Sequence, residues 1–217
     1  VTGQLACRGG AFSNPNGDAL VCDAISVGAD VFLRSGTVKG KYFAAKVEGR
    51  LDLTRGDIKG NLQIDQVAIT GDVLAERLKV GGTLTWRDLS GKIGMFDLEE
   101  AQVHKLDDDL GSWNCVLHYF LGGLTYQALG QAIAPRDRRP WLGENRTIPD
   151  KDARGNFLPV FAPQPYSQLA RVFDATGRRR EAARILFARE AGLRRNAHQR
   201  GYARLDGSLR AAWASFV

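Results

Sequence analysis

Apolar and polar residues alternate in short segments throughout the first half of the chain. Each segment has the pattern apolar-x-Gly-x-apolar-x-apolar and is followed by a short polar turn; copies begin at Val1, Val38, Val47, Ile58, Ile69 and Val80. The glycines at positions 49, 60, 71 and 82 are spaced by eleven residues. Alternation with a period of two indicates β-strands, and the constant spacing indicates a structural repeat.

This repeat predicts a mainly β fold, a right-handed parallel β-solenoid over residues 1–134. Two eleven-residue units would form one coil of about 22 residues, and about five coils would stack. An antiparallel sandwich is the alternative, but it does not require a constant spacing. The side chains predicted to point inward are Val47, Ile58, Ile69, Val80, Leu51, Leu62, Val73 and Leu84. Those predicted to point outward are Lys39, Glu48, Lys59, Thr70, Arg50, Asn61, Asp72 and Thr83.

Several segments interrupt or extend this pattern. Ser13 to Asp18 is rich in turn-forming residues and predicts a loop that protrudes from the first coil. Met95–Leu98 and Val116–Leu121 predict further strands. Between them, Asp107–Asp109 lies near His104, but it lacks the ligand spacing of a calcium loop, so a solvated loop or a cap of the solenoid is favoured.

The remaining chain predicts two further regions. Residues 135–163 contain many prolines and predict an irregular connector that packs on the core through residues such as Trp141. Residues 164–217 predict a helical hairpin, with Tyr166, Leu169, Ala170 and Phe173 on one helix, a stop at Gly177, and Ala182, Ile185 and Leu186 on the next. A terminal amphipathic helix is expected from Leu205 to Val217.

Charge divides the chain in the same place. Residues 1–134 hold 13 Lys and Arg against 16 Asp and Glu, whereas residues 135–217 hold 17 against 8. The basic region could meet a protein partner or an anionic membrane surface. Nucleic acid is the weakest candidate, because the basic clusters lack the interleaved aromatic residues of single-strand binders.

Motifs that would indicate catalysis are missing from the sequence. There is no dinucleotide-binding fingerprint, no nucleophile elbow and no CxxC pair, so no catalytic residue, cofactor or metal is predicted. Cys7, Cys22 and Cys115 indicate a reducing compartment, and Cys7 and Cys22 are expected to point inward. We therefore expect a cytoplasmic protein. Because the sequence starts at Val1, we also expect it to be a piece of a longer protein.

Five features together carry a resemblance: the glycine-containing repeats, Gly123-Leu-Thr-Tyr126, Trp141-Leu142, the segment Pro163-Gln-Pro-Tyr166-Ser-Gln-Leu-Ala170, and Gly177 followed by Glu181-Ala182. The chain resembles a bacterial family whose members often bear the automatic label "membrane-associated oxidoreductase". The resemblance implies a location at the membrane, since several members continue into spanning helices, but it brings no functional residues. The hairpin is similar to one tetratricopeptide unit, and the repeats are distantly similar to pentapeptide-repeat solenoids.

These observations favour a non-enzymatic scaffold or interaction module that lies at the inner face of the membrane. Its candidate contacts with an anionic partner or membrane are Arg178, Arg179, Arg180, Arg194, Arg195, Arg210 and Trp213. The alternative is an enzyme with a groove along the solenoid, which would use scattered residues such as Asp52, Asp57, Asp72 or His104.

Overall fold

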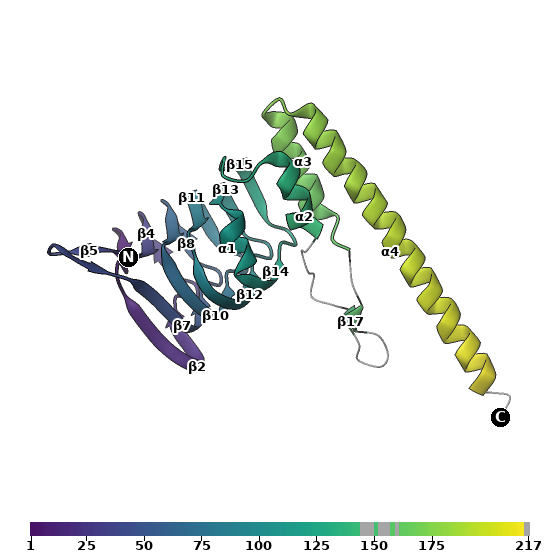
Figure 1. The fold of residues 1–217 in the computed structure, drawn as a ribbon, viewed down its shortest axis with the longest axis horizontal. Coiled ribbons are helices and arrows are strands. Elements are labelled where there is room, and N and C mark those ends of the chain that lie inside the picture. The colour runs from purple at the N-terminus through teal and green to yellow at the C-terminus, as the bar shows by residue number, and fades with distance from the viewer. Residues whose placement is uncertain (144–149, 152–156, 159–160, 215–217) are drawn as a thin grey trace.

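The computed structural model describes the backbone of residues 1–143, 150–151, 157–158 and 161–214. It describes the side chains of residues 1–37, 39–139, 141–142 and 161–197. Within these residues the chain forms a parallel β-solenoid followed by helices, as Figure 1 shows.

Two parallel sheets form the walls of the solenoid. The first contains β1 (Leu5–Ala6), β3 (Ser26–Val27), β4 (Val31–Arg34), β8 (Asp57–Ile58), β9 (Leu62–Asp65), β11 (Lys79–Arg87), β13 (Gln102–Asp108) and β15 (Thr125–Leu129). The second contains β2 (Ala11–Val21), β7 (Ala45–Asp52), β10 (Val67–Leu74), β12 (Ser90–Asp97) and β14 (Val116–Phe120). The second sheet has five strands, one from each of about five coils.

The strand register confirms that one coil takes two sequence units. Val47 pairs with Ile69 in one sheet and Leu62 pairs with Leu84 in the other, so partners are 22 residues apart. Successive eleven-residue units therefore lie in opposite sheets. Val80 pairs with Val103, 23 residues later, and a register shift between Val80 and Thr83 restores the 22-residue spacing, so that Leu84 pairs with Leu106.

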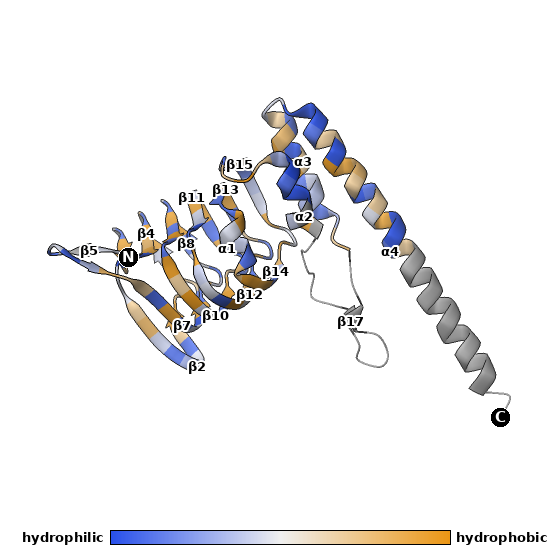
Figure 2. Cartoon of the chain, in the orientation of Figure 1, coloured by the Kyte–Doolittle hydropathy of each residue, from blue (hydrophilic) through white to orange (hydrophobic). Residues whose placement is uncertain are grey.

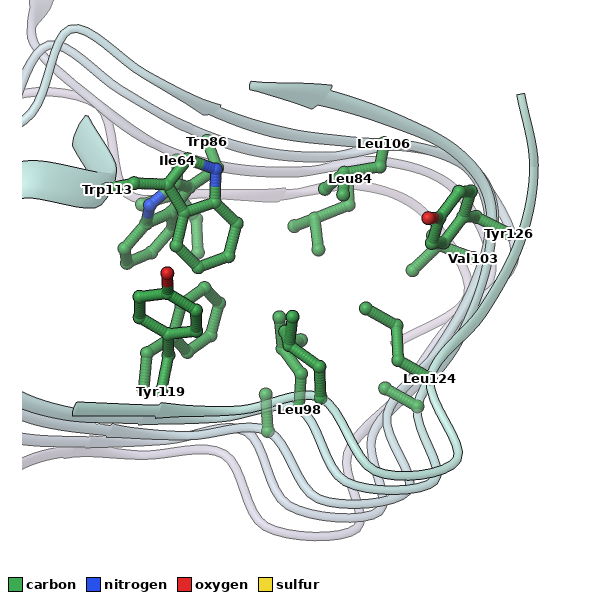
Figure 3. Packing of buried hydrophobic residues seen from close by; sticks show 14 of the residues in the cluster. Ile64, Leu84, Trp86, Leu98, Val103, Leu106, Trp113, Tyr119, Leu124 and Tyr126 are labelled. Carbon is green, nitrogen blue, oxygen red and sulfur yellow. The ribbon is translucent and has the colours of Figure 1, made fainter. Parts of the chain in front are cut away.

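The predicted inward columns form the core. Val47, Ile69, Leu51 and Val73 are 0 % exposed, and Ile58, Val80, Leu62 and Leu84 are also buried. Figure 3 shows side chains of both sheets meeting between the two walls. The outward residues are exposed or partly exposed, and Figure 2 shows hydrophobic and hydrophilic residues alternating along the strands. Alternation along a strand thus places one half of its side chains in the core.

Glycine is required where adjacent coils approach closely. Gly71 has φ +133°, and a Cβ there would lie 2.4 Å from the carbonyl oxygen of Gly49 in the preceding coil. Gly49 itself has φ +118°, and a Cβ there would lie 2.1 Å from the carbonyl oxygen of Asn14. A side chain at either position would push the coils apart, which explains the glycine column of the repeat.

Two segments near the N-terminus differ from the prediction. The unit at Val38 is not a solenoid strand, because β5 (Gly36–Val38) and β6 (Lys41–Phe43) form an antiparallel hairpin. Lys39 and Gly40 both have positive φ, which produces a tight turn that reverses the chain. Ser13 to Asp18 belongs to β2, where Ser13 pairs with Glu48 and Asp18 pairs with Arg50, so the intervening residues form a bulge.

Helices follow the last coils. They are the 3-10 turn η1 (Pro135–Asp137), α2 (Arg138–Gly143), α3 (Gln164–Ala175) and α4 (Arg179–Ala214), whereas the short helix α1 (Leu110–Asn114) lies within the coils, between β13 and β14. Strands β16 (Asp150–Lys151) and β17 (Phe157–Leu158) form a separate antiparallel pair. The expected stop at Gly177 is present, with φ +75°. The segment predicted as a terminal helix is helical to Ala214 as the continuation of α4, with no break before Leu205.

Candidate interaction surface

Helix α3 docks on the last coil through two glutamines. Gln164 accepts a hydrogen bond from the Gly123 backbone N–H at 3.1 Å and donates one to the Leu124 carbonyl at 3.1 Å. Gln168, one helical turn later, donates to the Tyr126 carbonyl. An edge strand would otherwise leave these backbone groups without partners. The Pro-Gln-Pro-Tyr-Ser-Gln segment therefore caps the solenoid.

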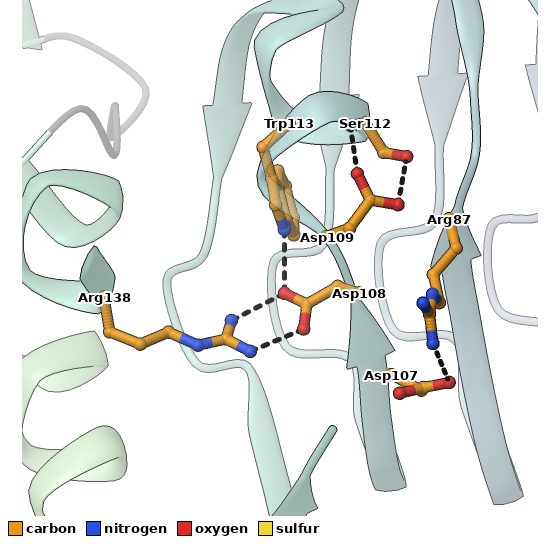
Figure 4. A network of polar contacts seen from close by, with 7 residues as sticks. All are labelled: Arg87, Asp107, Asp108, Asp109, Ser112, Trp113 and Arg138. Carbon is orange, nitrogen blue, oxygen red and sulfur yellow. Dashed lines mark hydrogen bonds and ion pairs between the residues drawn. The ribbon is translucent and has the colours of Figure 1, made fainter. Parts of the chain in front are cut away.

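A buried ion pair fastens α2 to the same end. Arg138 donates two hydrogen bonds of 2.6 Å to the two carboxylate oxygens of Asp108, and the Trp113 indole N–H donates to Asp108 at 2.8 Å (Figure 4). The Arg138 and Asp108 side chains are 1 % and 0 % exposed. The sequence favoured a solvated loop or a cap of the solenoid for this segment, and this is wrong for Asp108. Asp108 belongs to the wall strand β13, and its position in the strand alternation points it into the core.

The neighbouring aspartates have local structural roles. Asp107 lies 3.5 Å from Arg87 on the preceding coil. Asp109 caps α1 by accepting a hydrogen bond from the Ser112 backbone N–H at 2.7 Å. Partial burial raises the pKa of Asp109, but hydrogen bonds from Ser112 and Asp88 outweigh it and hold this pKa below its usual value. Side chains of the described residues contain no cluster of three or more His, Cys, Asp or Glu that could hold a metal ion.

The candidate arginines lie on or next to α4. Arg178, Arg179, Arg180, Arg194 and Arg195 are all exposed. The side chains of Arg210 and Trp213 lie outside the described residues. Among the side chains that the structure describes, these five arginines form one ion pair with a carboxylate, that of Arg179 with Asp174, at 4.0 Å and largely exposed. An exposed pair at this distance contributes little, so the described carboxylates compensate little of the positive charge of these five arginines.

An exposed phenylalanine lies among these arginines, and sequence reasoning missed it. Ala182, Ile185 and Ala188 are buried, whereas the Phe187 side chain is 77 % exposed. Arg180 and Arg194 are seven residues before and after Phe187, which is nearly two helical turns, so the three share one face of α4. We call Arg180, Phe187 and Arg194 the outer stripe. The sequence signal that could have identified this surface is the seven-residue spacing of Arg180 and Arg194 on either side of Phe187.

Only part of α4 has a helical neighbour. Its 36 residues span about 54 Å, whereas the 12 residues of α3 span about 18 Å. Figure 1 shows the C-terminal part of α4 extending beyond the other elements. None of the helices that the structure describes is long and apolar enough to cross a membrane.

A groove of about 820 Å³ lies beside the outer stripe, between η1–α2 and α4. Among the described residues, its lining contains three arginines, one carboxylate and several apolar side chains. They are Ala134, Pro135, Arg136, Arg139, Glu181, Ala183, Arg184, Ile185 and Phe187. The groove thus brings together residues that are about 45 positions apart in the chain, and no sequence motif marks them.

A second groove of about 500 Å³ crosses the first sheet and includes Asp57 and His104. These are two of the four residues considered for an enzyme; Asp52 and Asp72 lie on the second sheet. Asp57 pairs with Lys79 and Lys79 with Gln102, so Asp57 and His104 lie on coils two steps apart. Two steps correspond to about 10 Å, too far for direct proton transfer between the two side chains.

The three cysteines are free thiols. Cys7 and Cys22 are partly buried against the core of the first coil, and burial raises the pKa of both thiols. A raised pKa keeps a thiol protonated and weakly nucleophilic at neutral pH. The predicted inward orientation therefore leaves them as small apolar side chains.

Comparisons of the chain with protein-family models, with curated proteins and with solved structures found no match. The similarity to the bacterial family described above therefore stays a prediction, and the function must be inferred from the geometry of this surface.

Proposed function

We propose that this protein is a non-enzymatic interaction module that adsorbs to an anionic membrane surface through the outer stripe of α4. The observation that carries the proposal is the exposed Phe187 between Arg180 and Arg194. Helices that lie in a membrane interface combine basic residues with an aromatic or aliphatic side chain that enters the headgroup region.

The charge on this surface is sufficient for weak binding. Residues 179–197 contain six Arg and two Glu, a net charge of +4. Each cation near an anionic membrane contributes about 1 kcal/mol, and burying a Phe side chain contributes about 1.5 to 3 kcal/mol. Salt would screen the first contribution but not the second.

The solenoid would act as a rigid scaffold that holds α4 in place. Its coils are joined by backbone hydrogen bonds and by a continuous core, and α3 and α2 are fixed to its last coils by Gln164, Gln168 and Arg138. The packing of Ala182, Ile185 and Ala188 beneath the outer stripe orients its side chains away from the core. At the inner face of a membrane, the solenoid would then present its polar ladders to other cytoplasmic molecules.

Vesicle co-sedimentation tests the proposal. The protein should pellet with vesicles that contain phosphatidylglycerol and remain in solution with pure phosphatidylcholine, and binding should weaken from low to physiological salt. Replacing Arg180→Glu and Arg194→Glu should reduce the affinity about tenfold or more. Lys39→Glu with Lys92→Glu makes the same change in net charge at exposed positions of the hairpin and the solenoid, and should have a much smaller effect.

Equal pelleting with neutral vesicles would contradict the proposal, as would no pelleting with anionic vesicles at low salt. If vesicles are not bound but an acidic protein is, and the Arg180/Arg194 variant loses that protein, the surface serves a protein partner and the membrane proposal is wrong.

A further inference from the structure

The groove between η1–α2 and α4 has the charge of an anion site. Arg136, Arg139 and Arg184 contribute three guanidinium groups, and Glu181 contributes one carboxylate. Arg136 lies 3.7 Å from Asp137, but no carboxylate among the described side chains lies within ion-pair distance of Arg139 or Arg184. Guanidinium groups bind carboxylates and phosphates through paired, charge-assisted hydrogen bonds.

The other lining residues that the structure describes are apolar. Ala134 and Pro135 form one side of the groove, and Ala183, Ile185 and Phe187 form the other. The volume of about 820 Å³ lies within the usual range of small-molecule sites, about 300 to 1,000 Å³. An inorganic anion would leave most of this surface in contact with water, so a ligand with an apolar chain fits the groove better.

Both walls are held in place before any ligand arrives. Arg138, adjacent to Arg139, is fixed by its two hydrogen bonds to Asp108. On the opposite wall, Ala182 and Ile185 are buried on either side of the exposed Ala183 and Arg184. A site whose backbone is already ordered loses little conformational entropy on binding.

We infer that this groove binds an anionic amphiphile, a molecule with one carboxylate or phosphate group attached to an apolar chain. The anionic group would lie between Arg139 and Arg184, and the chain would lie along Ala134, Pro135 and Phe187. The inference rests on the proposed function and deepens it, because Phe187 belongs both to the groove and to the outer stripe. Two sources share this chemistry: an anionic membrane lipid and a free fatty acid.

Isothermal titration calorimetry of the full chain with monomeric compounds tests the inference. Dihexanoyl phosphatidylglycerol represents the lipid source and decanoate the fatty-acid source, each below its critical micelle concentration. Dihexanoyl phosphatidylcholine lacks the net charge and inorganic phosphate lacks the chain, so both controls should bind at least about tenfold more weakly. Binding of phosphatidylglycerol alone identifies a lipid, and binding of decanoate alone identifies a fatty acid; either result supports the groove.

Two variants locate the site. Arg139→Gln with Arg184→Gln should weaken binding about tenfold or more, because it removes two charged donors. Ala183→Trp should weaken it without a change in charge by filling the groove. Lys39→Gln with Lys92→Gln loses the same charge elsewhere and should bind normally. Circular dichroism should show the native spectrum for each variant.

The inference is overturned if neither amphiphile binds, if phosphatidylcholine binds equally well, or if the Lys39/Lys92 variant loses as much affinity as the groove variant. Anionic vesicles that still bind when neither monomeric amphiphile does would leave the proposed function standing and remove the groove. The reverse result would keep the groove and remove the membrane proposal.

Discussion

The solenoid and helix α4 differ in how many of their basic side chains form ion pairs and in whether their large apolar side chains are buried. On the solenoid, seven of the thirteen Lys and Arg side chains form ion pairs with described carboxylates, five of them across neighbouring coils: Arg34–Asp65, Arg50–Asp18, Arg55–Asp23, Arg77–Glu100 and Arg87–Asp107. Its large apolar columns are buried. On α4, Arg180 and Arg194 have no carboxylate partner among the described residues, and Phe187 is exposed.

The solenoid therefore satisfies most of its charged and apolar groups internally, whereas α4 leaves charged and apolar groups available to bind a partner. Exposed ion pairs on the solenoid contribute little stability individually, but they leave its surface nearly neutral. A surface that is neutral and polar has little attraction for an anionic partner, whereas a basic surface with an exposed aromatic ring has both electrostatic and hydrophobic attraction. The contrast between the two regions can be tested by matched substitutions.

The largest expected effect on stability comes from comparing a carboxylate placed in the solenoid core with one placed on the exposed face of α4. Leu62→Asp puts an unpaired charge in a core column and should destabilise the fold by several kcal/mol or unfold it. Phe187→Asp makes the same kind of change on α4 and should leave the thermal unfolding midpoint nearly unchanged while it weakens vesicle binding. If both variants unfold alike, Phe187 contributes to the core and the contrast is wrong.

The next largest effect concerns the ion pair that joins the two regions. Asp108→Asn leaves the buried Arg138 guanidinium without a counter-charge and should cost about 3 to 5 kcal/mol. Asp107→Asn breaks the partly exposed pair with Arg87 and should cost less than about 1 kcal/mol. Urea denaturation of both variants measures the two values. Similar costs would mean that burial does not set the strength of these pairs.

The glutamine cap should contribute a smaller amount. Gln164→Ala with Gln168→Ala leaves backbone groups of residues 123, 124 and 126 without partners, and should cost about 2 to 4 kcal/mol. Exposure of this edge should also promote self-association, which sedimentation velocity would detect. Gln127→Ala, at an exposed position on the same coil, is the control. An unchanged melting temperature in the double variant would show that α3 does not protect the edge.

The smallest expected effect on stability comes from the shifted pKa values of two glutamates on the solenoid, Glu99 and Glu48. Burial first, and then the nearby carboxylates of Asp97, Glu76 and Glu100, raise the pKa of Glu99. A raised pKa in the folded state means that stability falls as pH rises through that pKa, so Glu99→Gln should be slightly more stable than the native protein at pH 7. This gain should disappear at a pH below the ordinary glutamate pKa.

The pKa of Glu48 is shifted in the opposite direction from that of Glu99, so its effect on stability has the opposite sign. A hydrogen bond from Lys46 is the main cause that lowers the pKa of Glu48, so its ionised form favours folding and this contribution is lost as pH falls through the lowered pKa. Glu48→Gln should therefore be slightly less stable at pH 7. Melting curves at pH 3 and pH 7 check both variants, and shifts of the same sign at pH 7 would contradict the assignment.

The sequence by itself determined the solenoid. Alternation within a strand fixes which side chains enter the core, and a constant spacing of eleven residues fixes how coils stack, because both depend on neighbours at short and regular separations. Val47, Leu62 and Val73 could be assigned for this reason. At Val38 the same pattern failed, because the Lys39-Gly40 turn reverses the chain before a parallel strand can form.

Tertiary structure alone decided the surface on which function depends. Asp108 and Arg138 are 30 positions apart, and nothing local indicates that they pair. Ile185 and Phe187 are both apolar, and the position of α3 determines that Ile185 is buried while Phe187 faces outward; Leu186, which the sequence grouped with Ile185, is exposed as well. The groove likewise requires residues 134–139 to lie against residues 181–187. Contacts between distant segments depend on how completed elements dock, and that information is not contained in any local pattern.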